Sequence, residues 1–515
     1  MPRSLLALSR FHLCTLVLAA FTFVLMAAFT VGDHLAPAGR RLSKITGIDP
    51  PAYFGVSHSM LFDRDFDLRN QFSRIKPDEN PWTIIRPETG LPGSAYAIGY
   101  SILAMPFLAA GTLLDALAGN PVDGFSRFAI LGYCMANIVM SGIGLIVVFR
   151  FLAGIGELWG ISRERASWMA LVTTAGIFFG TTVLYYAFSE MSHAATFFCA
   201  SFFVGCWWKI RERVDARSWA VLGLFGGMLS ICRWQEAVFV GAPFVFDFAS
   251  RKMWKAFPQW VRLRAVYVCA AALCWIPQFL EWKSIYGTYL AKPYSSNVLT
   301  FPPPYVLQVL FSTENGWFVW TPVALLGVAG LLFGLVKFGW EYLPWLVVIG
   351  LEVSVVGATQ AWHGADAFSS RYMTSSAVLV AIGLATLFYA ASRPVRGLLG
   401  VVVAGMCLFS CLFVLQFRLD LIPRQDRLTA AELFTDKLRL PRAMKRKSAV
   451  RQAEAALKEG SVPAAIQILE QATASYGANR DTLDSLRKAY RVNGQSVQAG
   501  NADRQWQELM QSRLW

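Results

Sequence analysis

The sequence predicts an all-α, polytopic membrane helical bundle followed by a small helical tail. Only 16% of the 515 residues are charged and 55% are hydrophobic, whereas soluble domains usually carry about 25% charged residues. Apolar runs of about 20 residues, long enough to span a bilayer as helices, recur from Leu13 to Gln416. These runs predict a membrane domain over residues 1–417, a linker over 418–446 and a tail over 447–515.

The first apolar run, Leu13–Gly32, follows Arg3 and Arg10 as the core of a signal peptide would. Its roughly 20 residues exceed the 7 to 15 of such a core, so we expect an uncleaved first helix with a cytoplasmic N-terminus. Residues 33–93 then form a long extracytoplasmic loop. Ten further spans, which make eleven in total, are expected near residues 128–150, 168–187, 193–208, 218–231, 237–249, 265–281, 317–337, 342–359, 374–391 and 397–416.

The run at residues 94–117 decides the topology, because counting it as a span would reverse the side of every later loop. The positive-inside rule places basic loops in the cytoplasm. We therefore expect residues 94–117 to form an interfacial helix, which Pro106, Gly99 and Gly111 would tolerate. Eleven spans place the tail outside, and twelve would place it inside. The basic clusters that follow this rule are Lys209, Arg211, Arg213 and Arg217, and Arg251, Lys252, Lys255, Arg262 and Arg264.

Neither the net charge nor the cysteines indicate another class of protein. The net charge is +14, but much of the Lys and Arg lies between apolar runs, and no nucleic-acid recognition motif accompanies it. All nine cysteines lie in or beside apolar runs, without the spacing of a disulfide framework or a zinc site. We expect no nucleic-acid partner.

The first loop carries three aspartates in the stretch LFDRDFDLRNQF. Asp63, Asp65 and Asp67 repel one another unless a cation or a raised pKa relieves the repulsion. A carboxylate placed in this way can take a proton from an acceptor hydroxyl or hold a divalent ion beside a leaving phosphate. The alternative is a solvated acidic loop neutralised by Arg64 and Arg69.

Other unusual polar residues fall on the same predicted side of the membrane, where charged residues are costly unless they have a function. The stretch YYAFSEMSHAATFF offers Glu190 and His193, although helix capping also accounts for them. The turn RWQEA offers Arg233 and Gln235. An aromatic-rich loop at residues 282–316 and the stretch WHGADAFSSRYM complete the set, with Tyr286, Lys292, Trp362, His363, Asp366 and Arg371.

At these residues the sequence resembles the bacterial GT-C superfamily of polyprenyl-phosphate-sugar glycosyltransferases, relatives of protein O-mannosyltransferases and the aminoarabinose transferase. The resemblance covers residues 10–420 and rests on FDRDFDLRN, GYSILAMPFLAAG, EMSHA, RWQE, YGTYL, LFSTENGWFVWTP and WHGADAFSSRYM in that order.

The resemblance implies inverting transfer of a hexosyl or pentosyl group to an extracytoplasmic glycan, lipid or protein. It makes Asp63 the first choice and Asp65 the second for the catalytic base, and places Arg371, Arg233 and His363 near the donor phosphate. The family's usual aspartate-glutamate pair is Asp63-Arg64 here, so the acting carboxylate and any divalent cation stay open. The implied location is the bacterial inner membrane, with the active site facing the periplasm.

Two other functions fit parts of the pattern. A lipid or solute transporter, or a flippase, also gathers aromatics and charges, but it predicts midplane charges and internal repeats that the sequence does not clearly carry. A non-catalytic scaffold would recruit partners through the tail.

The tail predicts helical hairpins related by a 34-residue period, which is that of tetratricopeptide repeats. Gly494 follows AYRVN as Gly460 follows ALKE, and Ala499 corresponds to Ala465. One and a half such repeats fall short of the three that a solenoid normally needs. We expect the tail to pack on the membrane domain or to bind a protein partner, and a simple helical cap is the alternative.

Overall fold

The computed structural model describes residues 10–37, 41–75, 84–250, 257–293 and 299–515. Within these ranges the chain is helical and has no β-strand, only two isolated bridges. The predicted all-α class is therefore confirmed. The chain divides into two compact units: unit 1 comprises residues 1–306, 321–362 and 371–407, and unit 2 comprises residues 307–320, 363–370 and 408–515.

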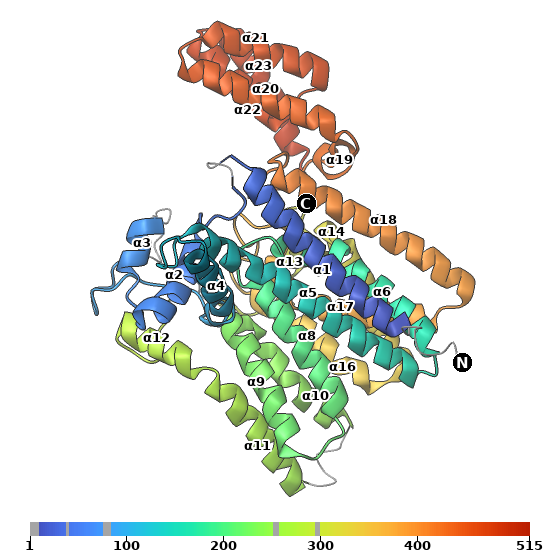
Figure 1. The fold of residues 1–515 in the computed structure, drawn as a ribbon. Helices are drawn as coiled ribbons and strands as arrows, with labels where there is room; N and C mark the ends of the chain where they lie inside the picture. The colour runs from blue at the N-terminus through green and yellow to red at the C-terminus, as the bar shows by residue number, and fades with distance from the viewer. Residues whose placement is uncertain (1–9, 38–40, 76–83, 251–256, 294–298) are drawn as a thin grey trace, which may run out of the picture. The chain divides into compact units, whose positions relative to one another are not determined.

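Unit 1 is a bundle of apolar helices joined by short turns. Its first helix, α1 (Arg10–Leu35), packs along α5 (Arg127–Leu158) and α6 (Arg163–Gly180), as Figure 1 shows. The other bundle helices are α8 (His193–Ile210), α9 (Ala216–Cys232), α10 (Ala242–Ser250), α11 (Phe257–Leu273), α12 (Ile276–Tyr286), α15 (Pro322–Phe338), α16 (Leu343–Gly357), α17 (Ala377–Ala390) and the first part of α18 (Arg393–Arg418). Short helical turns between them are α7 (Val183–Tyr186), η3 (Trp234–Gly241), η5 (Trp340–Tyr342) and η6 (Arg371–Met373).

Each of the eleven segments predicted to span the membrane lies largely in helix. Among the described residues, six helices are long and apolar enough to cross a membrane: α1, α4, α5, the stretch Phe257–Tyr286, the stretch Trp340–Gly357 and α18. Three shorter apolar helices are α9, α15 and α17. Helices of membrane type are thus present, and the count of eleven spans stays a prediction. All nine cysteines lie in the described ranges as free thiols.

The first loop and the segment after it contain more helix than the sequence indicated. The loop holds α2 (Asp49–His58), η2 (Ser59–Asp63) and α3 (Arg69–Ile75), and Figure 1 shows α2 beside α4 (Gly99–Leu117). The predicted interfacial helix over residues 94–117 is helical only from Gly99. By length and composition α4 also qualifies as a span, so its interfacial placement stays a prediction.

Helices α15 and α17 touch through three glycines. A Cβ atom added to Gly383 would lie 1.8 Å from the carbonyl oxygen of Gly327, and one added to Gly330 would lie 2.1 Å from that of Gly383. Small residues allow this backbone contact, which is a common way of packing helices in lipid. These three residues, named here the glycine seam, hold α17 against α15.

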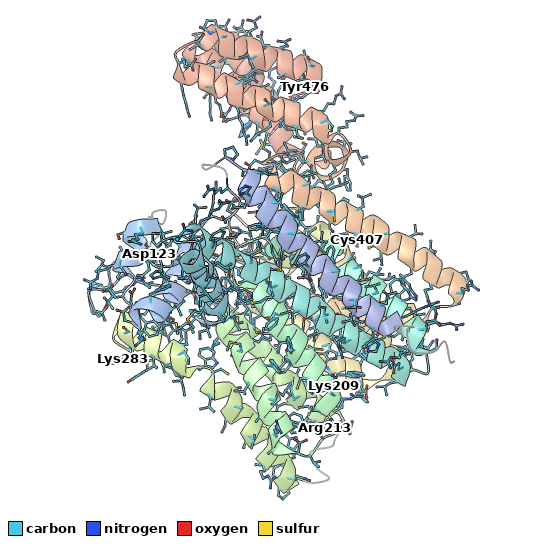
Figure 2. The ribbon with its side chains drawn as sticks, viewed as in Figure 1. Asp123, Lys209, Arg213, Lys283, Cys407 and Tyr476 are labelled. Atoms are coloured by element: carbon cyan, nitrogen blue, oxygen red, sulfur yellow. The ribbon has the colours of Figure 1, made fainter. Side chains whose placement is uncertain are left out.

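The basic residues used to orient the helices differ in their surroundings. Lys209 lies in the last turn of α8 and Arg213 follows the helix, and Figure 2 shows both far from Asp123, which precedes α5. Arg264 is buried instead, 2.6 Å from the carboxylate of Asp247 and 3.6 Å from the ring centre of Trp219. Arg264 therefore does not belong to an exposed basic loop, although Arg262 two residues before it is exposed. Arg251, Lys252 and Lys255 lie outside the described residues.

Unit 2 contains a short helical part and the tail. The short part holds most of α13 (Val306–Phe311) and α14 (Trp317–Trp320), and it pairs with the tail where Thr313 donates its backbone N–H to Trp515. The predicted linker at 418–446 already contains η7 (Ala431–Thr435), α19 (Asp436–Leu438) and the start of α20. The tail helices are α20 (Leu440–Lys458), α21 (Val462–Tyr476), α22 (Arg480–Val492) and α23 (Ser496–Gln511).

The tail helices form two hairpins around a small apolar core. Gly460 and Gly494 end α20 and α22 with positive φ angles of 80° and 72°, a conformation that favours glycine. Ala465 and Ala499, the residues that correspond across the 34-residue period, are both buried in this core. The helical hairpins expected of the tail are therefore present.

Candidate functional site

Four segments that are distant in the sequence meet in unit 1 and bring charged and aromatic side chains together. They are the first two turns of α2, the start of α8, the turn between α9 and η3, and η6. Two prolines follow Asp49 at the start of α2, where a missing backbone N–H removes no helical hydrogen bond. The group is named here the arginine site and comprises Asp49, Tyr53, His193, Arg233 and Arg371.

Asp49 is fixed by partners on both carboxylate oxygens. Its Oδ2 lies 2.9 Å from Nη1 of Arg371, and its Oδ1 accepts a 2.7 Å hydrogen bond from the Tyr96 hydroxyl. The two charged side chains are only 12% and 14% exposed. Burial opposes the charge on Arg371, but Asp49 beside it holds the pKa of this guanidinium above its usual value. The site therefore contains one oriented carboxylate and one permanent cation.

Arg233 adds a second cation to the site. Its Nη1 lies 3.3 Å from Oγ of Ser192 and 3.4 Å from Nε2 of His193. Among the described residues Arg233 forms no ion pair, and its buried Nε–H has no hydrogen-bond acceptor. The Nε–H of Arg371 is buried without an acceptor as well. Two guanidinium groups whose buried Nε–H donors lack an acceptor suit an anion.

Aromatic rings hold the two guanidiniums in place. The ring centre of Tyr372 lies 4.9 Å from the Arg233 guanidinium carbon and 5.5 Å from that of Arg371. The Tyr53 hydroxyl donates to Ser192 Oγ at 3.0 Å, and burial raises the pKa of Tyr53 to about 12, so it is a neutral hydrogen-bond donor. His193 is fully buried against the ring of Tyr186, with ring centres 4.4 Å apart.

The three first-loop aspartates predicted from the sequence are engaged by their own loop. Oδ2 of Asp63 accepts from the amides of Asn70 and Gln71 at 3.0 and 2.5 Å. Oδ1 of Asp65 accepts from the Ser59 hydroxyl at 2.6 Å, and Asp67 pairs with Arg69. The hydrogen bond from Arg69 holds the pKa of Asp67 below its usual value, although partial burial acts in the opposite direction. Each of the three carboxylates is therefore bound by a neighbouring residue of the same loop.

The loop contacts continue through His58 at the end of α2. Its Nε2 lies 2.8 Å from the Asp123 carbonyl oxygen, and its Nδ1 lies 3.0 Å from the amide of Gln71. Burial lowers the pKa of His58, so the neutral ring donates to Asp123 and accepts from Gln71. Asp63 therefore belongs to a hydrogen-bonded group that ties α2 to α3.

Four other predicted residues of unit 1 lie in separate surroundings. Glu190 forms a hydrogen bond with the Cys134 thiol, and the Tyr286 hydroxyl donates to the Ser94 carbonyl oxygen at 2.7 Å. Trp362 stacks on Tyr305 with ring centres 6.4 Å apart. Lys292 is exposed. Gln235 follows the arginine-site residue Arg233 by two positions, and its Nε2 is buried without a hydrogen-bond acceptor.

Two predicted residues belong to unit 2. His363 lies 3.7 Å from Glu314, and its Nδ1 accepts the backbone N–H of Ala365 at 3.1 Å. Asp366 pairs with Arg424 at 3.4 Å. Asp366 also lines a cavity of about 580 Å³ whose other charged residues are Asp420, Arg424, Glu432, Lys447, Arg451, Glu454, Arg480 and Asp481.

No group of three or more His, Cys, Asp or Glu side chains that could hold a metal ion occurs in the part of the chain that the structure describes. The arginine site offers one carboxylate against two guanidiniums. This set of groups suits an anion better than a divalent cation, which prefers several oxygen ligands.

The sequence analysis passed over Asp49, Tyr53, Tyr96 and Tyr372. One signal was available for Asp49: a carboxylate directly before two prolines marks the start of a helix, and this helix begins inside a long loop. The pairing of Asp49 with Arg371 joins residues 322 positions apart and leaves no local pattern. A search against protein-family models finds no match to this chain, and neither does a search of curated proteins.

Proposed function

We propose that the protein is an integral membrane glycosyltransferase that moves a sugar from a polyprenyl-phosphate donor to an extracytoplasmic acceptor. The observation that carries the proposal is the contact of Asp49 with Arg371 beside the guanidinium of Arg233, which forms no ion pair among the described residues. A base and an anion-binding pair at one place are what transfer from a phosphate-linked donor requires.

In the proposed reaction the two guanidiniums bind the donor phosphate, since each presents paired N–H donors to its oxygens. Asp49 takes the proton of the acceptor hydroxyl as that oxygen bonds to the anomeric carbon. The bond from this carbon to the phosphate oxygen breaks, and polyprenyl phosphate leaves with the electron pair. Arg233 and Arg371 stabilise the charge that develops on the leaving group. A single direct displacement by the acceptor oxygen gives inversion at the anomeric carbon.

Asp49 is our preferred base, ahead of Asp63 and Asp65. All three carboxylates accept hydrogen bonds, but those of Asp63 and Asp65 come from their own loop, whereas Asp49 lies beside the cations that would hold the donor. Hydrogen bonds from Tyr96 and Arg371 orient the carboxylate, so it is positioned before the acceptor binds.

The distribution of charge in unit 1 supports an active site on the extracytoplasmic side. His193 begins α8 and belongs to the arginine site, while Lys209 lies in the last turn of that helix and Arg213 follows it. An 18-residue helix is about 27 Å long, close to the thickness of the hydrocarbon layer. If the basic end is cytoplasmic, as the positive-inside rule predicts, the arginine site faces the periplasm of a bacterial inner membrane.

The acceptor class is a glycan, a lipid or a protein, and a divalent cation is not required by the proposed step. We also propose that the tail is a short tetratricopeptide-like unit for a protein partner. The matching turns at Gly460 and Gly494 and the matching buried positions Ala465 and Ala499 support it.

The test is sugar transfer or release by the purified full-length protein from a panel of polyprenyl-phosphate sugars, comparing wild type with Asp49→Asn, Asp63→Asn and Asp65→Asn. We expect Asp49→Asn to abolish transfer while donor binding remains. Loss of transfer in Asp63→Asn alone would return the role of base to Asp63. Failure of the wild type to turn over any donor, with movement of the lipid across a vesicle membrane, would favour a flippase.

A further inference from the structure

Beside the arginine site lie two carboxyl side chains that the proposed reaction does not use. Glu236 in η3 and Glu352 in α16 are fully buried, and their side chains are in hydrogen-bonding contact. Oε1 of Glu352 accepts from the Ser375 hydroxyl at 3.0 Å, and Oε2 accepts from Ser376. The Ser375 hydroxyl also lies within reach of Glu236, but it donates its one proton to Glu352, so neither oxygen of Glu236 receives a hydrogen bond in this arrangement.

Two ionised carboxylates cannot be stable in this arrangement. Each would be removed from water, and each would repel the other at short range in a medium of low dielectric constant. One positive charge between the two groups removes the repulsion and provides Glu236 with the partner that it lacks. A proton is the smallest such charge, and a pair of carboxyl groups that share one proton is a known solution to this problem.

We infer that Glu236 and Glu352 share one proton and that this acid pair fastens together the two segments that carry Arg233 and Arg371. Glu236 lies one helical turn after Arg233, and the two serines bound to Glu352 follow Arg371 by four and five residues. The pair therefore sets the spacing of the two guanidiniums. Both glutamates are positioning residues, because they act on the anion site only through the segments they join.

The charged groups around the pair are few. Arg233, on the same turn as Glu236, faces it. On the elements packed against α16, Asp247 of α10 is held by Arg264, and Glu341 of η5 lies 3.9 Å from Arg211. In η6, Arg371 is held by Asp49. Arg233 is therefore the nearby cation that offsets the remaining negative charge of the pair.

The shared proton makes stability depend on pH with a defined sign. The folded pair keeps a proton that two separate glutamates release once the protein unfolds, so the folded state binds more protons above the ordinary range of glutamate. Stability then falls as pH rises, until the folded pair loses its proton. Glu236→Gln provides an amide that donates to Glu352 at every pH, and so removes this dependence.

The experiment uses the full-length protein in detergent or nanodiscs and needs no substrate. Infrared difference spectra between neutral and alkaline pH should show a protonated carboxyl band in the wild type that both Glu236→Gln and Glu352→Gln abolish. Thermal unfolding of Glu236→Gln should be less pH-dependent than that of the wild type. Glu236→Ala, which leaves Glu352 with its two serine donors but without the facing carboxyl group, should be less stable than Glu236→Gln at every pH.

A second readout, which rests on the proposed function, is binding of a polyprenyl phosphate. We expect Glu236→Gln to bind within about twofold of wild type and Glu236→Ala about tenfold more weakly. Absence of the carboxyl band, or equal pH profiles for wild type and Glu236→Gln, would overturn the shared proton. The shared proton would also be overturned if the wild type needed Na⁺ or K⁺ for stability and Glu236→Gln did not. The pair would then hold a metal cation in place of a proton. If the band is present but no polyprenyl phosphate binds to the wild type, the proposed function fails and the acid pair stands.

Discussion

Arg371 and Asp49 form an ion pair with an N–O distance of 2.9 Å, although 322 positions separate them in the sequence. The pair joins the start of α2 to η6, the turn before α17. The carboxylate of Asp49 thereby lies beside two guanidiniums, those of Arg371 and Arg233, which we propose bind an anion.

Replacing Asp49 by asparagine should lower the rate of sugar transfer by about 10²- to 10⁴-fold, the usual contribution of a general base. The amide keeps the size of the side chain but cannot take the acceptor proton. Initial rates with a saturating polyprenyl-phosphate donor measure the effect. Asp67→Asn is the matched control, with a carboxylate paired to Arg69 in the same loop. Equal losses in both variants would indicate damage to the loop and not the removal of a base.

Arg233→Lys should weaken binding of a polyprenyl phosphate by about tenfold to a hundredfold, since a guanidinium offers paired donors that an ammonium cannot reproduce. Binding by the purified protein, measured as the dissociation constant at fixed salt, tests this. Arg213→Lys is the control, because Arg213 is exposed beyond the far end of α8. Unchanged affinity in Arg233→Lys would remove Arg233 from the anion site.

Glycine-to-alanine changes in the tail should have opposite effects at two positions. Gly460→Ala should reduce the free energy of unfolding by about 1 kcal/mol, because φ there is +80°. Gly500→Ala should increase it by about 0.5 to 1 kcal/mol, since Gly500 lies inside α23 with open space around it. Protease resistance of the tail in the full-length protein against denaturant concentration would measure both. A loss of stability in Gly500→Ala would contradict the assigned helix.

Lys437→Met should stabilise the folded protein at pH 7 by about 1 to 4 kcal/mol, because the buried lysine has lost a proton that the unfolded lysine keeps. Burial lowers the pKa of Lys437 to about 5, and its Nζ has no hydrogen-bond acceptor among the described residues. The unfolded lysine holds its proton to a higher pH than the folded one. Lys437 therefore lowers the free energy of unfolding by its full amount below about pH 5. This effect declines as pH rises toward the ordinary lysine value of 10.5.

Thermal unfolding of the wild type and Lys437→Met between pH 6 and about 10 would test the sign. The advantage of Lys437→Met should shrink steadily as pH rises. An advantage that grows with pH would mean that the lysine is charged and stabilising in the folded protein, for instance through the ring of Phe409 at 3.8 Å.

The sequence predicted the helices well because the rule that governs them is local. A run of apolar residues must satisfy its own backbone in lipid, and every predicted segment is largely helical for that reason. The hairpins of the tail follow likewise from the spacing of Gly460 and Gly494. Which helices cross the membrane depends on where the bilayer lies along the protein, so the number of spans does not follow from helix length alone.

The site was predicted only in part because its contacts join distant segments. Arg233, His193 and Arg371 were found as polar residues in unusual places. Asp49 was not found, since one carboxylate before two prolines is also typical of an ordinary helix start. Asp63 drew attention through the density of charge around it, yet its partners lie within eight residues along the chain. A crowded acidic stretch can thus be explained by local folding.

The glycine seam between α15 and α17 has a consequence for genetic variation in this protein. Neither Gly327 nor Gly383 carries a side chain that could react or bind, yet a single added methyl group at Gly383 would meet a carbonyl oxygen at 1.8 Å. The displaced helix would be α17, which begins four residues after η6, the turn that carries Arg371. In a saturation mutagenesis screen scored by cell phenotype, substitutions of these glycines should therefore be as harmful as substitutions of the charged residues. The cause would be altered helix spacing and not the loss of a reactive group.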